Sequence, residues 1–378
     1  MQIVASSSEV VVVGAGIVGC AVACELTRRG RSVTVVDDRA PGMGATQASA
    51  GILAPFIEAR HEGPLLELTA RSLGLFDDFI SQVRSESGSA VHYERTGTLD
   101  VAMDGDALAG LRAACEQLNA RQMHAELLDA AAVRRAEPQL SESAAGGLLI
   151  PTHGFVAAGE LTSALAASAT RRGAIFVGGS RVTRVSREGG GLQLHTTGNV
   201  PALRADAVVL AAGSWAGDIR IDGVEQALPV RPVRGQLLHV HWPGDHRIRR
   251  VLWSERCYVV PWQNRTVLVG ATEEEAGFEE RTTLAGVRDL VDALCDLLPQ
   301  AWTASLHAAK VGLRPATPDQ IPIIGWSGVL PNLMYATGHY RNGILLAPLT
   351  AELVASAIVE GRSDAMLELT RPQRFGEL

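Results

Sequence analysis

Three glycines close to the N-terminus have the spacing that binds the phosphates of a dinucleotide. Gly14, Gly16 and Gly19 follow an apolar run in the pattern GxGxxG and lead into a segment with helical periodicity. The first glycine permits a tight turn, the second lets the backbone approach a pyrophosphate, and the third allows the helix to pack closely. A helix that begins here would offer a phosphate its unpaired N–H groups and the positive end of its dipole. Asp37 follows at a distance that suits hydrogen bonds from ribose hydroxyls, so these residues together indicate dinucleotide binding.

A strand, a helix and a second strand are needed to hold these residues. Residues 10–13 form a β-branched run, residues 17–29 have the pattern of a helix that Gly30 ends, and residues 32–36 resume a buried strand. A GxGxxG pattern alone is weak, because glycine-rich turns are common and can serve only as connections. The complete βαβ unit ending in Asp37 favours a dinucleotide site, but it does not distinguish NAD from FAD.

Three later segments favour FAD. Residues 44–55 are rich in small and hydroxyl side chains, which suits close approach to a phosphate or a flat ring, although a flexible loop has the same composition. Residues 173–185 begin as an apolar segment with Gly178 and Gly179, and the alternation at residues 181–185 predicts a strand. Residues 205–217 predict a buried parallel strand that ends at Gly213 and returns the chain to the cofactor crevice. An NAD domain normally completes its sheet with consecutive strands. Here buried parallel-type strands recur about two hundred residues apart, so we expect a discontinuous cofactor domain with other segments of the chain inserted into it.

The inserted material predicts helices and antiparallel strands. Residues 65–83 and 108–121 have amphipathic helical periodicity, and residues 93–103 suggest a pair of strands around Gly97. Further antiparallel strands are expected at residues 236–242, 251–262 and 266–271, with Gln263 and Asn264 as a polar turn.

The expected fold is α/β, and α+β overall, with a discontinuous Rossmann-type FAD-binding domain and a substrate domain built on an antiparallel sheet. A chain of 378 residues is long enough for two domains of ordinary size. The FAD-binding domain is predicted to comprise residues 1–85, 150–230 and 310–378, and the substrate domain residues 86–149 and 231–309.

Composition argues against several classes of protein. The net charge of −7 and the lack of a long Lys/Arg run argue against nucleic acid as a partner, since such affinity depends on basic side chains. Residues 1–9 have neither a basic segment nor a long apolar run, so neither a signal peptide nor an integral membrane segment is expected. Five cysteines without a CxxC pair fit a reduced cytoplasmic protein in which they are small buried hydrophobes. No metal site is expected, and the sequence leaves open whether the chain forms a homo-oligomer.

Four segments of the second half carry a resemblance to a known family. They read CYVVPW at residues 257–262, GLRPATPD at 312–319, IPIIG at 321–325 and YATGHYRNGILLAP at 335–348. Together with the βαβ unit they resemble the FAD-dependent D-amino-acid oxidase family, and within it the glycine oxidases of thiamine biosynthesis, along essentially the whole chain. The GHYRNGILLAP part is the most specific, because sarcosine oxidases and D-amino-acid dehydrogenases usually differ there.

The resemblance implies roles for individual residues. Arg314 would bind the substrate carboxylate, Tyr258 would hydrogen-bond the same group, and Arg341 would lie near the flavin and the active-site entrance. Ala50 and Ile52 would shape the substrate pocket. The residues implied to bind the cofactor are Gly14, Ala15, Gly16, Ile17, Val18, Gly19, Asp37, Asp38, Thr46, Ala48, Ser49, Ala50, Gly51, Val182, Ala212, Gly213, Trp215, Arg314, His339, Tyr340, Arg341, Asn342, Gly343 and Ile344.

The resemblance also implies that FAD is held noncovalently, since Gly312 stands where sarcosine-oxidase-like members carry the cysteine that links to the flavin. A helix expected at residues 348–360 begins with a proline, which a first turn tolerates. Its positive end, fed by the loop of residues 338–343, would stabilise negative charge on the pyrimidine side of a flavin.

Elementary chemistry agrees with these roles, although an ordinary structural role is open for each residue. Arginine offers a permanently charged planar fork that matches a carboxylate, and Lys310 is the only lysine in the chain. Outside its motif, Arg314 would be taken for a surface or ion-paired arginine, and Tyr258 for a core aromatic residue. His339 resembles a neutral packing histidine more than a catalytic base.

The reaction implied is oxidative deamination of glycine, and of small amines or D-amino acids, by hydride transfer from the α-carbon to the flavin, with O2 reduced to H2O2. Positioning by Arg314 and Tyr258 would be the main contribution of the protein, and no catalytic base is needed. The nearest alternatives are a D-amino-acid dehydrogenase and a sarcosine oxidase-like enzyme, which differ in pocket size near Ile52 and in electron acceptor. A noncatalytic flavin-binding component would have no use for Arg314 and Tyr258, and a nicotinamide dehydrogenase would leave residues 338–343 without a role.

Overall fold

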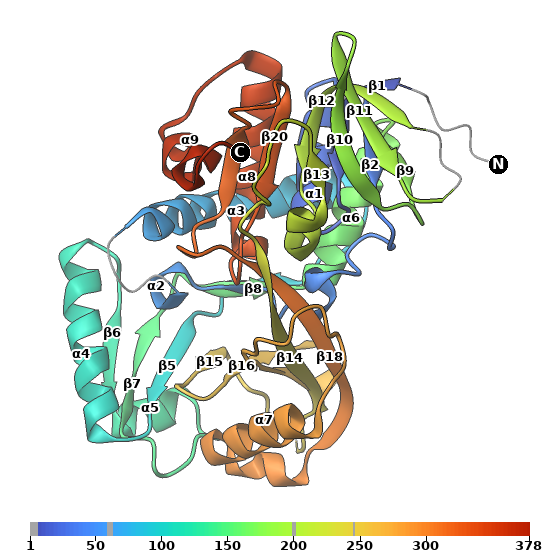
Figure 1. Ribbon diagram of the computed structural model, residues 1–378. Helices are drawn as coiled ribbons and strands as arrows, with labels where there is room; N and C mark the ends of the chain where they lie inside the picture. Colours follow the sequence, from blue (N-terminus) through green and yellow to red (C-terminus); the bar gives the residue numbers. More distant parts are fainter. Residues whose placement is uncertain (1–6, 59–62, 199–201, 245) are drawn as a thin grey trace.

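The fold consists of two lobes, each built around a large sheet. A computed structural model describes residues 7–58, 63–198, 202–244 and 246–378. The upper lobe in Figure 1 holds a nine-stranded sheet, the lower lobe an eight-stranded sheet, and a small three-stranded sheet joins segments of both. The expected α/β fold, α+β overall, is confirmed. Residues 1–6, within the segment predicted to carry neither a signal peptide nor a membrane span, lie outside the described residues.

The centre of the nine-stranded sheet is parallel and contains the predicted βαβ unit. Its parallel strands, in spatial order, are β9 (Ile175–Val177), β2 (Val33–Val36), β1 (Ser7–Val13), β12 (Leu203–Leu210) and β20 (Leu333–Thr337). Because β1 pairs with β12 directly, strands far apart in the sequence share one sheet, as predicted. The sheet is extended by β11 (Gly191–Thr196), β10 (Val182–Glu188), β13 (Arg220–Ile221) and β19 (Ile323–Trp326).

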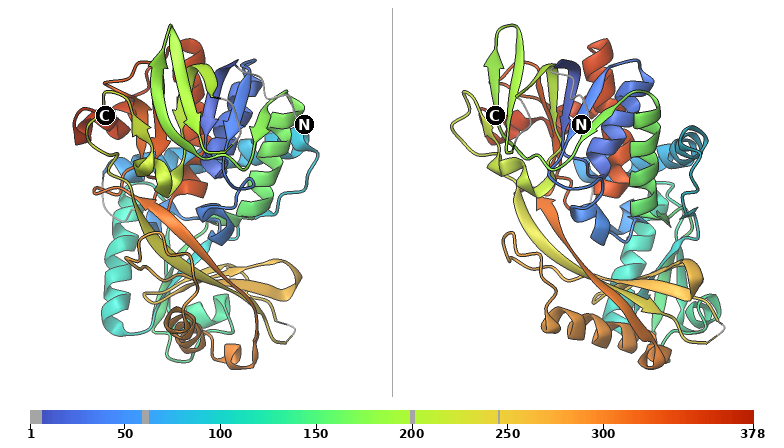
Figure 2. Two further views of the ribbon diagram at one scale, coloured as in Figure 1. Left: turned by 45° about the vertical axis from the view of Figure 1, so that its right-hand side comes forward. Right: turned by 90° about the vertical axis from the view of Figure 1, so that its right-hand side faces the viewer.

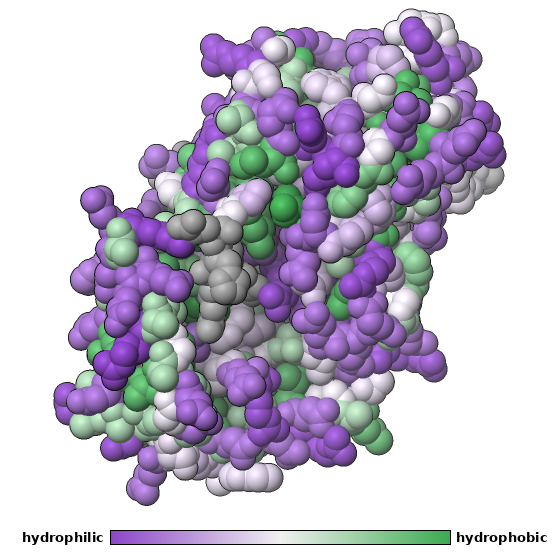
Figure 3. Space-filling model, turned by 60° about the vertical axis from the view of Figure 1, so that its left-hand side comes forward, coloured by the Kyte–Doolittle hydropathy of each residue, from purple (hydrophilic) through white to green (hydrophobic). Residues whose placement is uncertain are grey.

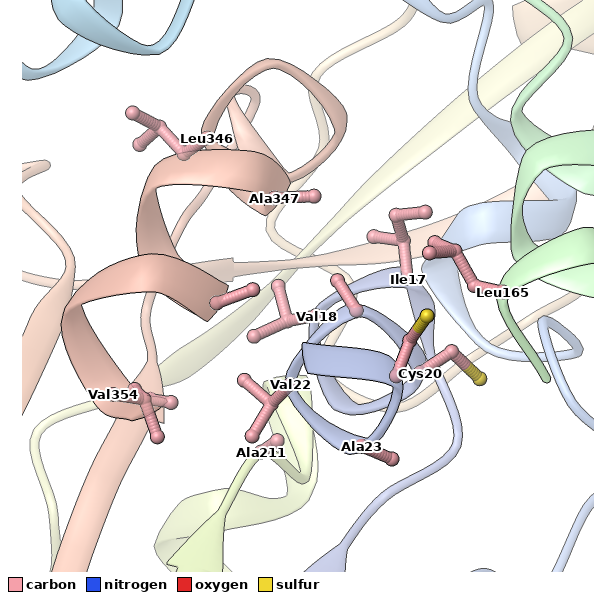
Figure 4. Packing of buried hydrophobic residues seen from close by; sticks show 14 of the residues in the cluster. Ile17, Val18, Cys20, Val22, Ala23, Leu165, Ala211, Leu346, Ala347 and Val354 are labelled. Carbon is pink, nitrogen blue, oxygen red and sulfur yellow. The ribbon is translucent and has the colours of Figure 1, made fainter. Parts of the chain in front are cut away.

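Four helices pack beside this sheet and form the largest core. They are α1 (Ile17–Arg28), α3 (Pro64–Ser87), α6 (Ala158–Arg171) and α8 (Gly343–Glu360). In Figure 4, Val18 and Val22 of α1 lie on the side of α8, while Ile17 and Cys20 lie on the side of α6. Small side chains on α1 allow this close approach on two sides.

Helix α8 begins earlier than the sequence predicts. Residues 348–360 were expected, but α8 starts at Gly343, so Pro348 lies inside it rather than in its first turn. By length and hydropathy α8 would suit a membrane span, yet 67% of that window is buried inside the fold. Its contacts with α1 and α3 make it a core helix.

The eight-stranded sheet forms the second lobe. Its order is β18 (Ser305–Ala316), β14 (Arg231–His241), β17 (Thr266–Gly270), β16 (Tyr258–Pro261), β15 (Val251–Trp253), β5 (Thr98–Ala102), β7 (Gly146–Ile150) and β6 (Glu126–Asp129). All neighbours are antiparallel except β15 and β5. Helices α4 (Gly105–Ala120), α5 (Ala130–Ala136) and α7 (Leu284–Leu297) accompany it. Figure 2 shows the long strands β14 and β18 running side by side from the upper lobe into the lower one.

Two strand predictions need correction. Residues 251–262 form two strands, β15 and β16, because a turn at residues 254–257 interrupts them. Residues 93–103 do hold strands β4 (Tyr93–Glu94) and β5 on either side of Gly97, but these do not pair with each other. Strand β4 joins the three-stranded sheet with β8 (Gly154–Val156) and β3 (Ile52–Leu53), since the left-handed backbone of Gly97 redirects the chain between sheets.

We propose that the two large sheets mark the two domains expected from the sequence. Strand β18 crosses the predicted boundary at residue 310 and links both lobes. Short helices complete the fold: α2 (Pro55–Glu58), α9 (Ala365–Thr370), and the 3-10 segments η1 (Ala45–Ala48), η2 (Gly213–Asp218), η3 (Gln263–Arg265), η4 (Pro299–Thr303) and η5 (Pro372–Phe375). The predicted polar turn is η3, where Asn264 has a φ of 56°.

The surface and the cysteines are ordinary for a globular fold. Hydrophilic residues cover most of the face shown in Figure 3, with smaller hydrophobic areas between them. All five cysteines are buried and free. Within the described ranges, no group of three or more His, Cys, Asp or Glu residues is arranged to hold a metal ion.

Candidate active site

One cavity of about 420 Å³ collects nearly all of the residues singled out in the sequence. It runs from the carboxyl ends of the parallel strands to the ends of β14, β16 and β18. Every predicted cofactor or substrate residue lines it except Ala15 and Gly19. Lining residues that sequence reasoning did not single out include Arg39, Ser180, Arg181, Thr183, Gly235, Trp253 and Thr337.

At two positions of the glycine turn, only glycine fits. Gly14 has a φ of +107°, and a Cβ there would overlap the carbonyl oxygen of Ala211. A Cβ on Gly19 would overlap the carbonyl oxygen of Gly14, so this glycine lets α1 approach the turn. At Gly16 a Cβ would meet only the Thr46 hydroxyl, at 3.7 Å, so this glycine leaves space on the cavity side.

Asp37 organises the turn as well as facing the cavity. Its Oδ2 accepts a hydrogen bond of 2.6 Å from the Ala15 N–H, and its Oδ1 accepts one of 2.8 Å from the Arg39 N–H. Burial raises the pKa of Asp37, and the two backbone N–H groups oppose that rise. The sequence suggested only a ribose acceptor, whereas the carboxylate also ties the end of β2 to the turn after β1.

The neighbouring charged residues are paired. Arg181 donates to Asp38 at 2.7 Å, and although burial opposes it, this partner lowers the pKa of the Asp38 carboxyl. The Arg39 guanidinium lies 4.5 Å from the ring centre of Trp215 and pairs with Glu280 at 2.7 Å. Arg39 therefore connects the cofactor lobe to the loop that follows β17.

The start of α1 suits a negatively charged group. Helix α1 has no acidic residue in its first turn and no side-chain cap at Gly16. The Ile17 N–H donates to the Thr46 hydroxyl at 3.2 Å, which holds η1 against the start of α1. An uncapped helix end beside a glycine turn is a site for a pyrophosphate.

A second helix also begins at the cavity. Asn342, Gly343 and Ile344 line it, and α8 starts without a side-chain cap and without an acid in its first turn. His339 is fully buried, and its Nε2 lies 3.0 Å from the Thr350 hydroxyl. Burial lowers the pKa of His339 to about 3, so the ring is neutral at physiological pH and serves packing rather than base catalysis.

Two glycines leave space on the face of the sheet for the side chains of Arg314 and Tyr258. These side chains come from β18 and β16, the outer strands of the four-strand series β18, β14, β17 and β16. The guanidinium of Arg314 occupies the place of a Cβ at Gly235 on β14, and the Tyr258 ring does the same at Gly270 on β17. Arg314 Nη1 donates to the Thr272 carbonyl oxygen at 2.9 Å, and the Tyr258 ring packs 5.3 Å from Trp253.

Tyr340 and Arg341 form the wall next to Arg314. Tyr340 has a φ of +48°, and its hydroxyl donates to Oε1 of Glu273 at 2.6 Å. Arg341 Nη1 lies 3.8 Å from Oε2 of the same carboxylate. Glu273 was missed because it sits in the run TEEEAGFEE, which has the composition of a solvated loop.

Gly312 packs tightly against the opposite wall. A Cβ there would lie 3.0 Å from Ala48 Cβ and 3.1 Å from the Ala45 carbonyl oxygen. A cysteine at this position would therefore need the wall to move. This packing gives a steric reason for a glycine at this position.

The residues present fit FAD. The cavity joins a glycine turn and an uncapped helix end, which suit a pyrophosphate, to a second helix end beside Arg314 and Tyr258, which suits the flavin and substrate. Along this path Gly16 leaves room for close approach to the backbone, whereas the missing Cβ atoms of Gly14 and Gly51 let the backbone pack against Ala211 and Val156.

Comparison with known proteins agrees with this geometry. Residues 9–357 match the family model DAO, described as FAD dependent oxidoreductase. The chain is 36% identical over 367 residues to a bifunctional protein ThiO/ThiG of Nostoc sp., covering 95% of this chain and 54% of that protein. It therefore spans about half the length of that relative.

A relative of matching length is a glycine oxidase of Geobacillus kaustophilus. The two chains are 32% identical over 351 residues, with 93% of this chain and 92% of the relative covered. A crystal structure of glycine oxidase from the same organism superposes with a TM-score of 0.91, covering 96% of each chain.

Proposed function

Because the chain belongs to the DAO family of FAD-dependent oxidoreductases, we propose that it oxidises glycine to an imine that hydrolyses, with O2 as the electron acceptor. The product of O2 would be H2O2, and the pathway served would be thiamine (thiazole) biosynthesis. Small amines and D-amino acids are expected as secondary substrates. Similarity to the ThiO/ThiG protein and to glycine oxidase supports this choice.

The observation that carries the proposal is the pair Arg314 and Tyr258 laid across two glycines at the cavity wall. A permanently charged fork and a hydroxyl on one wall suit a small carboxylate. Arg314 is held by the Thr272 carbonyl oxygen, and Tyr258 is held by packing on Trp253. Both donors are thus oriented before substrate arrives, which favours a single pose of the α-carbon.

The chain's own contribution to the reaction is binding, orientation and exclusion of water. FAD, when bound, supplies the two-electron acceptor and the subsequent reaction with O2. Arg314 fixes the carboxylate, and Ala50 and Ile52, which line the cavity, limit the room for a side chain. The neutral, buried His339 offers no base, so the amine would be used in its unprotonated form.

Two alternatives differ in chemistry. A D-amino-acid dehydrogenase or sarcosine oxidase-like enzyme would share Arg314 but need more room near Ile52 or another electron acceptor. A noncatalytic flavin-binding component would not require the glycines that clear space for Arg314 and Tyr258. We further propose a cytoplasmic location, supported by five buried free cysteines, which fit a reducing compartment.

Aerobic turnover distinguishes these functions. Purified holoenzyme is assayed for peroxide and ammonia with glycine, sarcosine and D-alanine, and in parallel with an artificial electron acceptor. The proposal expects the highest kcat/KM with glycine and stoichiometric peroxide. Turnover only with the artificial acceptor would indicate a dehydrogenase, and a preference for sarcosine or D-alanine would indicate the related enzymes.

A further inference from the structure

The loop between β17 and α7 places one carboxylate beside two cavity-lining residues. Glu273 accepts the Tyr340 hydroxyl at 2.6 Å and lies 3.8 Å from Arg341. Both partners line the cavity. The preceding residue, Thr272, supplies the carbonyl oxygen that holds Arg314. Glu273 is therefore one residue away from the contact that orients the proposed substrate anchor.

The other acids of this loop have partners elsewhere. Glu274 pairs with the buried Arg234 at 2.5 Å, Glu280 pairs with Arg39 at 2.7 Å, and Glu275 pairs with Arg231. Glu273 is directed instead at the wall next to Arg314. Burial and Glu273 raise the pKa of the Tyr340 hydroxyl to about 12, and the charges of Arg341 and Arg314 oppose that rise. The four groups thus lie within electrostatic reach of one another.

We propose that Glu273 is a specificity residue that excludes substrates with a second carboxylate. This inference rests on the proposed function and names its substrate class: amino acids and amines with a single carboxylate. Arg314 takes the first carboxylate, and the positive charge of Arg341 on the same wall would attract a second one. Glu273 compensates the charge of Arg341 and repels any further anion, which is selection by an unfavourable contact.

The ion pair between Glu273 and Arg341 contributes little to the stability of the fold. Its side chains are 38% and 58% exposed, and exposed ion pairs at this separation contribute little to stability because solvent screens them. Glu273→Gln should therefore fold normally. Its amide oxygen can still accept the Tyr340 hydroxyl, so the substitution removes charge while keeping the hydrogen bond.

The test compares one and two carboxylates in the holoenzyme, by turnover and by binding. Turnover uses glycine and iminodiacetate. Binding uses acetate and malonate, which contain no amine to oxidise, titrated against the flavin absorption spectrum. Glu273→Gln should raise kcat/KM for iminodiacetate relative to glycine, and the affinity for malonate relative to acetate, by about three- to tenfold. Glu273→Asp keeps the charge and should keep most of the wild-type discrimination.

Glu275→Gln is the matched control, since it removes the same charge from the same loop where the partner, Arg231, does not line the cavity. The discrimination of wild type against a second carboxylate should weaken at high ionic strength, because salt screens the charge of Glu273. The discrimination of Glu273→Gln should depend less on salt, because this charge is absent. A purely structural role for Glu273 would not produce this difference.

Unchanged ratios in Glu273→Gln, or equal changes in Glu275→Gln, would overturn the inference. Failure of acetate and malonate to bind wild type and both Gln variants would do the same, because carboxylates would then not use this wall. If wild type does not oxidise glycine but the malonate-to-acetate ratio still responds to Glu273→Gln, the proposed reaction fails and the selection against a second carboxylate stands.

Discussion

The guanidinium of Arg314 lies directly over Gly235, in the space that a Cβ would fill on any other residue. The clash would involve Cζ and both Nη atoms of the arginine. Gly235 and Gly312 face each other across β14 and β18, so the strand next to Arg314 carries no side chain there. The orientation of the anchor thus depends on a residue that has no functional group of its own.

Gly235→Ala tests this dependence. The methyl group would displace the guanidinium, so kcat/KM for glycine should fall roughly tenfold or more, as when a hydrogen bond to a charged group is lost. The flavin-to-protein ratio of the purified variant should be that of wild type, because Gly235 lies on β14 and is not part of the glycine turn. Steady-state kinetics and the flavin-to-protein ratio give both readouts.

Gly110→Ala is the control for Gly235→Ala, since a Cβ at this position in α4 meets nothing within 4 Å. It should leave kinetics unchanged and stabilise the helix slightly. Wild-type kinetics in Gly235→Ala would show that Arg314 does not need its observed position.

Asp37→Ala should lose FAD on dialysis. The substitution leaves the N–H groups of Ala15 and Arg39 without their acceptor and loosens the turn that would bind the pyrophosphate. The flavin-to-protein absorbance ratio before and after dialysis measures the loss. Asp38→Ala removes the adjacent carboxylate, which pairs with Arg181 rather than with the N–H groups of the turn, and should retain more FAD. If Asp37→Ala retained all of its FAD, Asp37 would have no role in cofactor binding and would only be a charged residue at the end of a strand.

FAD should leave the protein intact when the chain is denatured by acid or heat. Gly312 has no side chain that could link to the flavin, and a Cβ at this position would press against Ala48 and Ala45. The measurement is the colour of the supernatant and the mass of the precipitated chain. A yellow precipitate with a flavin mass adduct would contradict noncovalent binding.

Two buried histidines predict acid sensitivity. Burial lowers the pKa of His153 and of His339 to about 3, from an ordinary 6.5. Between these values the unfolded chain binds protons that the folded chain does not, so stability is fully present above pH 6.5 and is lost as the pH falls towards 3. The midpoint of thermal unfolding should therefore decrease across this range.

His153→Leu should flatten that decrease. Neither ring nitrogen of His153 has a hydrogen-bond partner among the described residues, and the ring packs 5.2 Å from Phe56. A leucine of similar size binds no proton, so the difference in bound protons between the unfolded and folded chains decreases by up to one. His124→Gln, at an exposed position, should leave the profile unchanged. Equal profiles for wild type and His153→Leu would show that this histidine does not contribute.

Patterns local in the chain predicted the cofactor side of the cavity. The glycine turn, the strand before it and Asp37 follow from spacing, because turn geometry and helix ends are set by neighbouring residues. The start of α8 was misplaced, since Pro348 suggests a first turn while tertiary packing extends the helix back to Gly343. Local patterns fix the type of an element better than its ends.

Tertiary contacts determine the residues that sequence reasoning missed. Gly235 and Glu273 acquire their positions only when β14, β18 and the loop after β17 meet, so nothing in their own segments marks them. Arg39 likewise gains its partners Trp215 and Glu280 from distant segments. The motif GLRPATPD identified Arg314, but not the carbonyl oxygen of Thr272 that holds it.

The most direct test of glycine oxidation anchored by Arg314 is the anaerobic rate of flavin bleaching, measured by stopped flow. Wild type should be bleached by glycine, and Arg314→Ala should bind FAD normally yet react with glycine roughly ten- to more than a hundredfold more slowly. Arg314→Lys should recover only part of the rate, because a point charge lacks the two-pronged fork. A simple amine without a carboxylate should react equally with all three proteins. No bleaching of wild type by glycine, or an equal loss towards the simple amine in Arg314→Ala, would contradict the assignment.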